Sequence, residues 1–277
     1  MKTALITGTS SGIGLETAVL LAQNGYTVVA TMRNLEKRAA LETRASELGV
    51  TLEVLELDAQ NDSSVSSAVN AILERHGKID VLVNNAGAGH LGSLEQISLA
   101  DAQRVMDQNF WSAWRVTQAV MPHMRAARSG RIISVSSVGG VMGLPFNEAY
   151  CAAKFALEGM MECFAPVAAR FGVQVSLVEP GPVHTAFLEN VGGREHIGAT
   201  GDYAPFVAAY VGMIQKNFSG MGQSAADIAS VILEVLQAEQ PHLRYQTGDA
   251  VRARVAAKLS DTTGEHALRA GAMMLGA

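Results

Sequence analysis

A tyrosine and a lysine four positions apart are the residues whose types and spacing most directly suggest chemistry. In the stretch AYCAAKFALEG, Tyr150 and Lys154 stand among small and apolar helix formers. Positions i and i+4 share a helix face, so both side chains can enter one cleft. A phenol has a pKa of about 10, and a nearby cation stabilises its phenolate. The pair predicts that Lys154 lowers the pKa of Tyr150 for proton transfer; the alternative is an ordinary amphipathic helix.

Two serines could hold the reacting oxygen beside this pair. Ser136 and Ser137 end the run GRIISVSS, directly before the glycines of VGGVMG. A hydroxyl at such a position can polarise a substrate oxygen during proton transfer. One of the two is expected to do so, although either alone could be a strand-end cap.

A glycine motif, TGTSSGIG, follows the first expected strand and opens the first expected helix. Its glycines stand where the backbone must turn tightly and approach a pyrophosphate, with the helix amides facing the anion. The alternative is a tight strand-to-helix turn without a ligand. The cofactor-binding residues expected here are Gly8, Ser10, Ser11, Gly12, Ile13 and Gly14.

The next expected strand ends VVATMRN, at the place where a dinucleotide enzyme selects its cofactor. An acidic residue there binds the adenosine ribose, whereas an arginine can pair with a 2′-phosphate. Met32 and Arg33 occupy this place. NADP(H) is therefore the expected cofactor, with Arg33 on its phosphate; the alternative is a solvated surface arginine.

Polar residues close the third and fourth expected strands, at the carboxyl ends where open α/β sheets bind ligands. An aspartate follows LEL, and the fourth strand ends in NNAG. The aspartate could otherwise be a loop residue or a helix cap, and NNAG a turn whose amides satisfy backbone groups. The cofactor-binding residues expected here are Asp58, Asn85, Ala86 and Gly87.

Short β-branched runs alternate with longer helical patterns, which is typical of strands joined by helical crossovers. Runs such as VLV at 81–83 are apolar throughout, as in parallel sheets covered on both faces. The pattern predicts an α/β fold, a Rossmann-like doubly wound parallel sheet of about seven strands with helices on both faces. The expected strands lie at 3–7, 26–32, 51–57, 79–85, 130–137, 173–180 and 242–247. The expected helices lie at 14–25, 35–49, 64–77, 102–124, around Tyr150, and at 225–237.

Residues 1–250 are expected to form one dinucleotide-binding catalytic domain. From about 186 to 222 the pattern changes to glycines and aromatics, which predicts a substrate lid. Residues 251–277 are expected to be a weakly helical, partly disordered C-terminal tail.

Apolar side chains follow Ser137 and populate the lid, so a bulky, largely apolar alcohol or ketone is the expected substrate. The alternative is that these side chains fill core beneath the lid. They are Val138, Val141, Met142, Leu144 and Phe146 after the serine, and Tyr203, Phe206, Tyr210 and Met213 in the lid.

Composition and charge exclude several classes of partner. Acidic residues number 26 against 21 basic ones, with no basic cluster, so nucleic acid is not expected as a partner. No run approaches the ~20 apolar residues of a membrane span, and none reads as a signal peptide. Cys151 and Cys163 fall too far apart on one helix to bridge, which favours a reducing, cytoplasmic setting. The seven histidines lack ligand spacing, so no metal site is expected.

Together these motifs resemble the classical short-chain dehydrogenase/reductase family, from Lys2 to about Gln246. The resemblance selects Ser137 over Ser136, because the family's serine precedes its tyrosine by thirteen positions. It also implies that EPGPVHTAF holds the nicotinamide end of the cofactor. The implied catalytic residues are Asn109, Ser137, Tyr150 and Lys154, and the implied nicotinamide-binding residues are Pro180, Gly181, Val183 and Thr185.

The resemblance implies hydride transfer between nicotinamide and a substrate carbon. Tyr150 would donate the proton, Ser137 would hydrogen-bond the same oxygen, and Asn109 would hold a water that links Lys154 to solvent. A homodimer or homotetramer through the helices of Asn109 and Tyr150 is also implied. Trp111 and Trp114 on the first of these helices are expected in the core or in a subunit contact.

Several stretches, including GPVHTAF and LRY, are most similar to the branch of the family that contains estradiol 17-beta-dehydrogenases and retinol dehydrogenases. In that branch a histidine helps to recognise the steroid, and Met213 stands at its place here. The expected substrates are therefore a broader range of hydrophobic carbonyls, and they include retinoid-like alcohols and aldehydes.

Two other functions compete with this interpretation. One is a noncatalytic dinucleotide sensor that binds a protein partner through the lid, and the Ser137, Tyr150 and Lys154 set argues against it, since a sensor needs no proton transfer. The other is a sugar epimerase or dehydratase, and the lack of a sizeable C-terminal substrate domain argues against that.

Overall fold

Seven parallel strands form the centre of the computed structural model, which describes residues 1–185, 191–193 and 201–276. Their order is β3-β2-β1-β4-β5-β6-β9, so the chain winds outward in opposite directions from β1 and β4. This order confirms the predicted doubly wound sheet and places a topological switch point between β1 and β4. The strands are β1 (Thr3–Thr7), β2 (Thr27–Met32), β3 (Glu53–Glu56), β4 (Val81–Asn84), β5 (Gly130–Val135), β6 (Val173–Glu179) and β9 (Arg244–Gln246).

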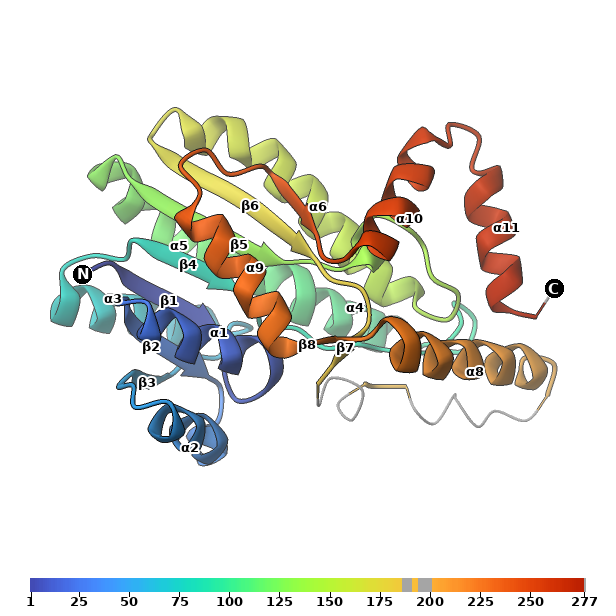
Figure 1. The fold of residues 1–277 in the computed structure, drawn as a ribbon, viewed down its shortest axis with the longest axis horizontal. Helices are drawn as coiled ribbons and strands as arrows, with labels where there is room; N and C mark the ends of the chain where they lie inside the picture. The colour runs from blue at the N-terminus through green and yellow to red at the C-terminus, as the bar shows by residue number, and fades with distance from the viewer. Residues whose placement is uncertain (186–190, 194–200, 277) are drawn as a thin grey trace.

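Helices cover both faces of this sheet (Figure 1). On one face lie α1 (Gly12–Gln23) and α9 (Ala225–Gln237). On the other lie α3 (Asp62–His76), α5 (Ser112–Ala127) and α6 (Glu148–Ala169). The short α2 (Ala39–Glu47) connects β2 to β3. The predicted helices on both faces are thereby confirmed.

The continuous apolar runs of the strands are explained by these two layers. In β1, Ala4 and Ile6 pack into the cluster beneath α1 and α9, whereas Leu5 packs into the cluster beneath α3, α5 and α6. Successive strand residues point to opposite faces, so a strand buried on both faces needs apolar residues at every position.

Side-chain caps fix where several helices begin. The Asn61 side chain accepts a hydrogen bond from Ser64 N at the start of α3. Ser98 does the same for Asp101 N at the start of α4 (Leu99–Met106). Ser224 and Asp227 form a reciprocal capping box at the start of α9. Each cap satisfies an amide that the first helical turn leaves without a partner.

The long helix expected at 102–124 is interrupted. Between α4 and α5, residues Asp107–Trp111 form a turn of π-helix. A π-turn inserts one extra residue into a helix and is found frequently at functional sites. Here it carries Asn109, one of the predicted site residues.

Part of the predicted lid, 186–190 and 194–200, lies outside the described residues. The described remainder contains the helix α8 (Ala204–Met221), and the paired short strands β7 (Val183–His184) and β8 (Gln223–Ser224) flank the lid on either side. The lid prediction as a loop is thus incomplete, because an 18-residue helix occupies half of the segment.

The helical character expected of the C-terminal tail is present, whereas the partial disorder expected there is not seen in its described residues. Its residues form α10 (Asp249–Ser260) and α11 (Glu265–Met274), which lie beyond the carboxyl ends of the strands (Figure 1). Val251 and Val255 pack against Val138 and Met142, directly after the candidate serine. The tail is helical because these apolar contacts offset its weak intrinsic pattern.

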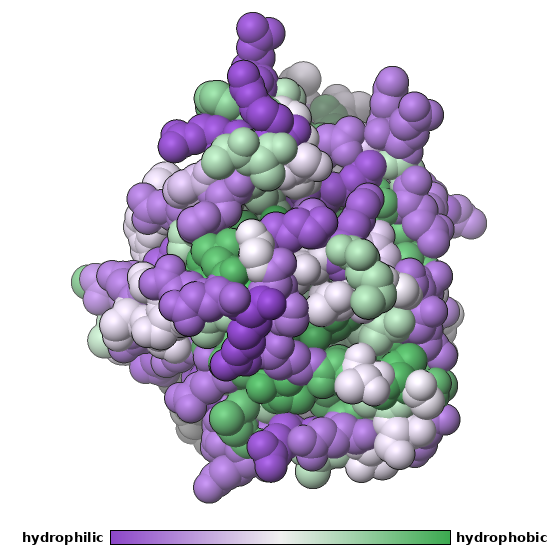
Figure 2. All heavy atoms as spheres, turned by 90° about the vertical axis from the view of Figure 1, so that its left-hand side faces the viewer, coloured by the Kyte–Doolittle hydropathy of each residue, from purple (hydrophilic) through white to green (hydrophobic). Residues whose placement is uncertain are grey.

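The side that carries the N-terminus is largely hydrophilic, with smaller hydrophobic groups between polar residues (Figure 2). Among the described residues, no helix is long and apolar enough to cross a membrane. The same part of the chain contains no group of three or more side chains placed to hold a metal ion.

Candidate active site

The glycine motif forms the turn between β1 and α1, and its geometry requires glycine. Gly8 and Gly12 adopt φ of +71° and +60°. A Cβ atom at Gly14 would lie 2.3 Å from Gly8 O. Ser11 begins α1 without a side-chain cap, so the first amides of the helix can donate to a bound anion. The loop of Ser10, Ser11 and Ile13 therefore fits a dinucleotide phosphate.

Asn85 holds this loop in place. Its Nδ2 donates to Thr7 O at 3.0 Å and to Gly8 O at 2.9 Å. The backbone amides of Asn85 and Ala86 donate to Thr7 Oγ1 at 3.0 and 3.1 Å. Asn85 thus satisfies backbone groups, as in the alternative interpretation of NNAG, and shapes the glycine loop at the switch point.

Arg33 and Asp58 lie at the carboxyl ends of the neighbouring strands β2 and β3. The exposed Arg33 side chain makes no hydrogen bond or ion pair with another described residue. Asp58 Oδ1 accepts from Gln60 N at 3.0 Å, and Asp58 N donates to Ser64 Oγ at 2.9 Å. Asp58 is therefore a loop residue, since Asn61 supplies the cap of α3.

Ser137 and Tyr150 meet directly, which separates Ser137 from Ser136. A hydrogen bond joins the two side chains, and Ser137 Oγ also accepts from Gly139 N at 3.1 Å. A Cβ atom at Gly139 would lie 3.5 Å from both Ser137 Oγ and Tyr150 Cε1. Ser136 lies beside Glu158 instead, because a Cβ atom at Gly140 would lie 2.6 Å from Ser136 Oγ and 3.1 Å from Glu158 Cγ.

Lys154 lies between the tyrosine and the end of β4. Its Nζ donates to Val135 O at 3.0 Å and lies 5.8 Å from the centre of the Tyr150 ring. A Cβ atom at Gly87 would lie 3.5 Å from Lys154 Nζ and 2.7 Å from Asn109 Oδ1. Glycine at this position lets both side chains approach the backbone.

The π-turn directs the Asn109 side chain at the backbone just after Gly87. Asn109 Nδ2 donates to Ala88 O at 2.9 Å and to Val105 O at 3.0 Å, and Oδ1 accepts from Ala88 N at 3.2 Å. The amide thus clamps the chain that follows NNAG. The structure brings together all four predicted catalytic residues, Asn109, Ser137, Tyr150 and Lys154.

The predicted lowering of the tyrosine pKa is wrong. Burial raises the pKa of Tyr150 to about 12, and the Ser137 hydrogen bond opposes this shift. Burial lowers the pKa of Lys154 to about 8, while the charge of Glu158 raises it. Burial disfavours the charged form of each group, and for Tyr150 this effect exceeds any help from the ammonium. At neutral pH Tyr150 is a protonated acid.

The EPGPVHTAF segment connects the glycine loop to the serine. Val138 N donates to Pro180 O at 2.8 Å, and a Cβ atom at Gly12 would lie 3.2 Å from Thr185. A Cβ atom at Gly181 would lie 2.7 Å from Val251 of α10, a tail contact that the sequence interpretation missed. The predicted nicotinamide-binding residues Pro180, Gly181, Val183 and Thr185 therefore lie between the phosphate loop and Ser137.

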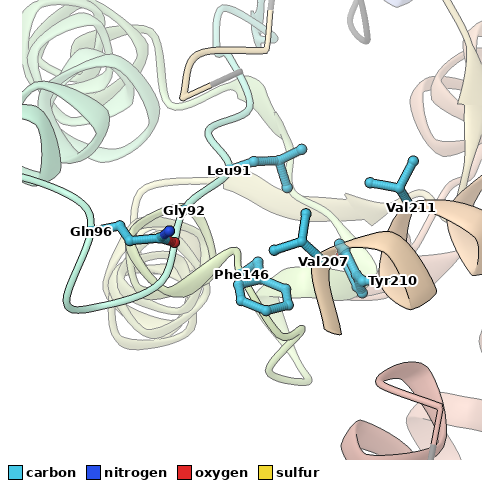
Figure 3. Close-up of a pocket in the computed structure, with 7 residues that line it drawn as sticks. All are labelled: Leu91, Gly92, Gln96, Phe146, Val207, Tyr210 and Val211. Atoms are coloured by element: carbon cyan, nitrogen blue, oxygen red, sulfur yellow. The ribbon is translucent and has the colours of Figure 1, made fainter. Parts of the chain in front are cut away.

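Apolar residues from three segments face one another close to the start of α6 (Figure 3). Leu91 comes from the loop after β4, Phe146 precedes α6, and Val207 and Tyr210 come from α8. The space between them is about 10 Å³, room for roughly one water molecule. Leu91 has no local sequence signal, because only the fold brings it to α8.

A larger pocket of about 450 Å³ lies next to this space, and Phe146 borders both. Its other walls include Leu94, Pro145, Phe206 and Leu275. The predicted apolar residues Phe146, Tyr203 and Phe206 thus line a pocket. Tyr203 also donates from its hydroxyl to Glu95 at 2.7 Å. By contrast, Val138 and Met142 fill core against α10, as in the alternative interpretation.

Comparison with known proteins gives the family. Residues 2–196 match the short chain dehydrogenase family. The chain is 45% identical to retinol dehydrogenase 8 of Bos taurus, over 99% of this chain and 90% of the relative. It is 41% identical to 17-beta-hydroxysteroid dehydrogenase type 1 of Homo sapiens, over 95% of this chain and 82% of the relative.

The architecture agrees with these relatives. A solved short-chain dehydrogenase from Streptomyces avermitilis superposes with a TM-score of 0.81 at 28% identity, covering 93% of this chain and 92% of the other. The family match agrees with the glycine loop at the switch point and with the buried Tyr150 and Lys154. The chain therefore belongs to the short-chain dehydrogenase family, whose members are oxidoreductases that bind a nicotinamide dinucleotide.

Proposed function

We propose that this oxidoreductase uses NADP(H) and acts on an apolar secondary alcohol or ketone, or on a retinoid-like alcohol or aldehyde. The observation that carries this proposal is the hydrogen-bonded Ser137–Tyr150 pair beside Lys154. A phosphate-binding loop, and an apolar pocket bordered by Phe146 and Glu148 at the start of the helix that carries Tyr150, support it. Retinol dehydrogenase 8 and 17-beta-hydroxysteroid dehydrogenase type 1, the relatives with 45% and 41% identity, are named for substrates of this kind.

The proposed roles follow from the site's geometry. Gly8, Gly12 and Gly14 leave space for the dinucleotide phosphates, and when bound the cofactor supplies or accepts the hydride. In reduction, Tyr150 donates its proton to the substrate oxygen, and Ser137 hydrogen-bonds the same oxygen. Lys154 stabilises the phenolate that remains.

Further residues position these groups and the cofactor. Asn109 holds the chain after NNAG by hydrogen bonds to Ala88. In the proposal it also binds the water through which Lys154 exchanges protons with solvent. Asp58, Ala86 and Gly87 border the cofactor at the carboxyl ends of β3 and β4, and Pro180–Thr185 holds the nicotinamide end.

Arg33 is expected to set the preference for NADP(H). It follows β2 directly and has no described carboxylate partner, so its guanidinium is available to a 2′-phosphate. Arg33→Ala is expected to reduce kcat/KM for NADPH by roughly 10- to 100-fold while leaving NADH nearly unchanged. The measurement is kcat/KM for both cofactors at a fixed ketone concentration.

Arg38→Ala is the matched control for this prediction. Arg38 is also an exposed arginine near β2, but it pairs with Glu42 at 3.2 Å. This variant is expected to keep the wild-type cofactor preference. Equal efficiency of NADPH and NADH in the wild type, or an unchanged preference in Arg33→Ala, would contradict the assignment.

Apolar size is expected to determine substrate efficiency. The 450 Å³ pocket is lined by Leu94, Pro145, Phe146 and Phe206. Burying hydrocarbon against these side chains stabilises binding by about 25 cal/mol per Å². With NADPH, kcat/KM should rise along a panel of ketones of increasing apolar area, steroids and retinoids included. Higher efficiency on sugars or hydroxy acids would refute the proposed substrate class, and a lack of turnover with every carbonyl would favour the sensor.

The proposal extends to the organisation of the chain. Residues 1–250 form one catalytic domain with a lid at about 186–222, followed by the tail at 251–277.

The aromatic rings of Phe110, Trp111 and Trp114 lie within 6 Å of one another. The two tryptophans remain 44% and 42% exposed, which supports a homodimer or homotetramer through these helices. The free thiols of Cys151 and Cys163 support a cytoplasmic setting.

A further inference from the structure

A group of charged and polar side chains lies one helical turn beyond Lys154, and none of the roles above uses it. We name it the Glu158 network: Glu158 on α6, Glu179 at the end of β6, and Arg244 and Gln246 on β9. Arg244 belongs to the LRY stretch of the sequence, and the sequence alone did not indicate a role for it.

Glu158 lies one helical turn after Lys154 on the same face of α6. Arg244 Nε donates to Glu158 Oε2 at 3.0 Å and lies 3.4 Å from Glu179 Oε1. Gln246 Nε2 donates to Glu179 Oε2 at 2.8 Å. Arg244 therefore bridges two carboxylates that come from different elements.

Burial makes this arrangement energetically demanding. The Glu158 side chain is 7% exposed and that of Glu179 is fully buried. Removing one partner of a buried ion pair leaves an uncompensated charge, which costs far more than breaking a surface pair. The Glu158 carboxylate thus lies between the Arg244 guanidinium on β9 and the helical turn of α6 that carries Lys154.

We propose that Glu158 is a positioning residue that keeps the Lys154 ammonium charged beside Tyr150, and that Arg244 keeps Glu158 ionised for this purpose. This inference rests on the proposed function, in which the charged Lys154 stabilises the Tyr150 phenolate. Glu158 touches neither the substrate nor the reacting atoms; it acts through Lys154.

The pKa shifts agree in sign with this geometry. Burial lowers the pKa of Lys154 to about 8, and the Glu158 charge works against that shift. Burial raises the pKa of Glu158, whereas the neighbouring Ser136 hydroxyl and Arg244 lower it. Burial also raises the pKa of Glu179, to about 7, and the negative charge of Glu158 adds to this rise.

The groups that face Glu158 come from four elements. On α6 itself they are Lys154 and Glu162; Ser136 follows β5, Glu179 ends β6, and Arg244 lies on β9. Without the Glu158 charge, burial would act on Lys154 unopposed. The ammonium would then lose its proton at a lower pH.

Glu158→Gln tests the proposal because it removes the charge and keeps the shape. In the wild type, the rate of ketone reduction should fall as the pH rises through the pKa of Lys154, near 8. In Glu158→Gln this alkaline limb should move to lower pH by about one unit, roughly a tenfold loss at pH values above the limb, with little change well below it. Glu158→Asp, which keeps the charge, should return most of the limb to its wild-type position.

Glu162→Gln is the matched control. Glu162 also pairs with Arg244, at 2.5 Å, but its side chain is 60% exposed, so this variant should keep the wild-type profile. A merely structural role for Glu158 would lower the rate at every pH and leave the limb in place. That result would overturn the proposal.

A direct titration separates this inference from the proposed function. The ¹³Cε NMR signal of Lys154, assigned by its loss in Lys154→Arg, should titrate about one pH unit lower in Glu158→Gln, whether or not a substrate is turned over. An unmoved titration overturns the inference, while an absence of turnover in the wild type overturns only the proposed function. Should Glu158→Gln fail to fold, Arg244→Gln carries the test, because it removes the cation that keeps Glu158 ionised. A smaller shift in the same direction is expected, and an unmoved titration would again contradict the proposal.

Discussion

Tyr150→Phe is expected to lower kcat for ketone reduction by about 10³-fold or more while leaving the fold and cofactor affinity nearly unchanged. The substitution removes only the hydroxyl that is hydrogen-bonded to Ser137. General acid catalysis contributes about 10²- to 10⁴-fold, whereas losing one neutral hydrogen bond changes the free energy of unfolding by only about 1 kcal/mol. Steady-state kinetics with NADPH, together with thermal unfolding, measures both quantities.

Tyr26→Phe is the control for this prediction. It makes the same chemical change next to β2, among residues that pack beneath α1 and α9. We expect wild-type kcat from this variant. If Tyr150→Phe turned over as fast as the wild type, Tyr150 could not be the proton donor.

Gly14→Ala is the second substitution with a large expected effect. The new Cβ atom would lie 2.3 Å from Gly8 O and 2.4 Å from Asn85 Nδ2, two atoms that hydrogen-bond each other. Because the methyl group meets backbone, the loop must shift. Cofactor affinity should fall by more than about 100-fold, and the free energy of unfolding by roughly 1–3 kcal/mol. Isothermal titration with NADPH and denaturant unfolding measure these changes.

Gly159→Ala is the matched glycine substitution. Gly159 lies inside α6, and a Cβ atom there would meet nothing within 4 Å. Alanine is favoured over glycine in a helix interior, so this variant should gain up to about 1 kcal/mol of stability and bind the cofactor normally. Normal NADPH binding by Gly14→Ala would show that the loop does not need glycine there.

Features written in local sequence could be predicted without the structure. The apolar runs of β1 and β4 and the periodic residues of α9 gave these elements directly, since strand alternation and helix periodicity act over a few residues. The same holds for the glycine loop and for Tyr150 and Lys154, whose chemistry depends on fixed short spacings.

Features that depend on distant contacts could not be predicted in this way. The π-turn that carries Asn109 interrupts a sequence that is helical throughout. The α10 contacts with Val138 stabilise a tail whose own pattern is weak. The sign of the Tyr150 pKa shift depends on how much water the folded chain excludes, and spacing along one helix does not contain that information.

The central claim is that the site transfers hydride from a nicotinamide dinucleotide to an apolar carbonyl. The most direct measurement is the mass of the alcohol formed from such a ketone with NADPH deuterated at nicotinamide C4. The account predicts one deuterium on the carbinol carbon for each NADPH oxidised when the transferred face is labelled, and no product from Tyr150→Phe. The account would be contradicted if the alcohol carried no deuterium with either face of nicotinamide C4 labelled. It would also be contradicted if no apolar carbonyl gave any alcohol.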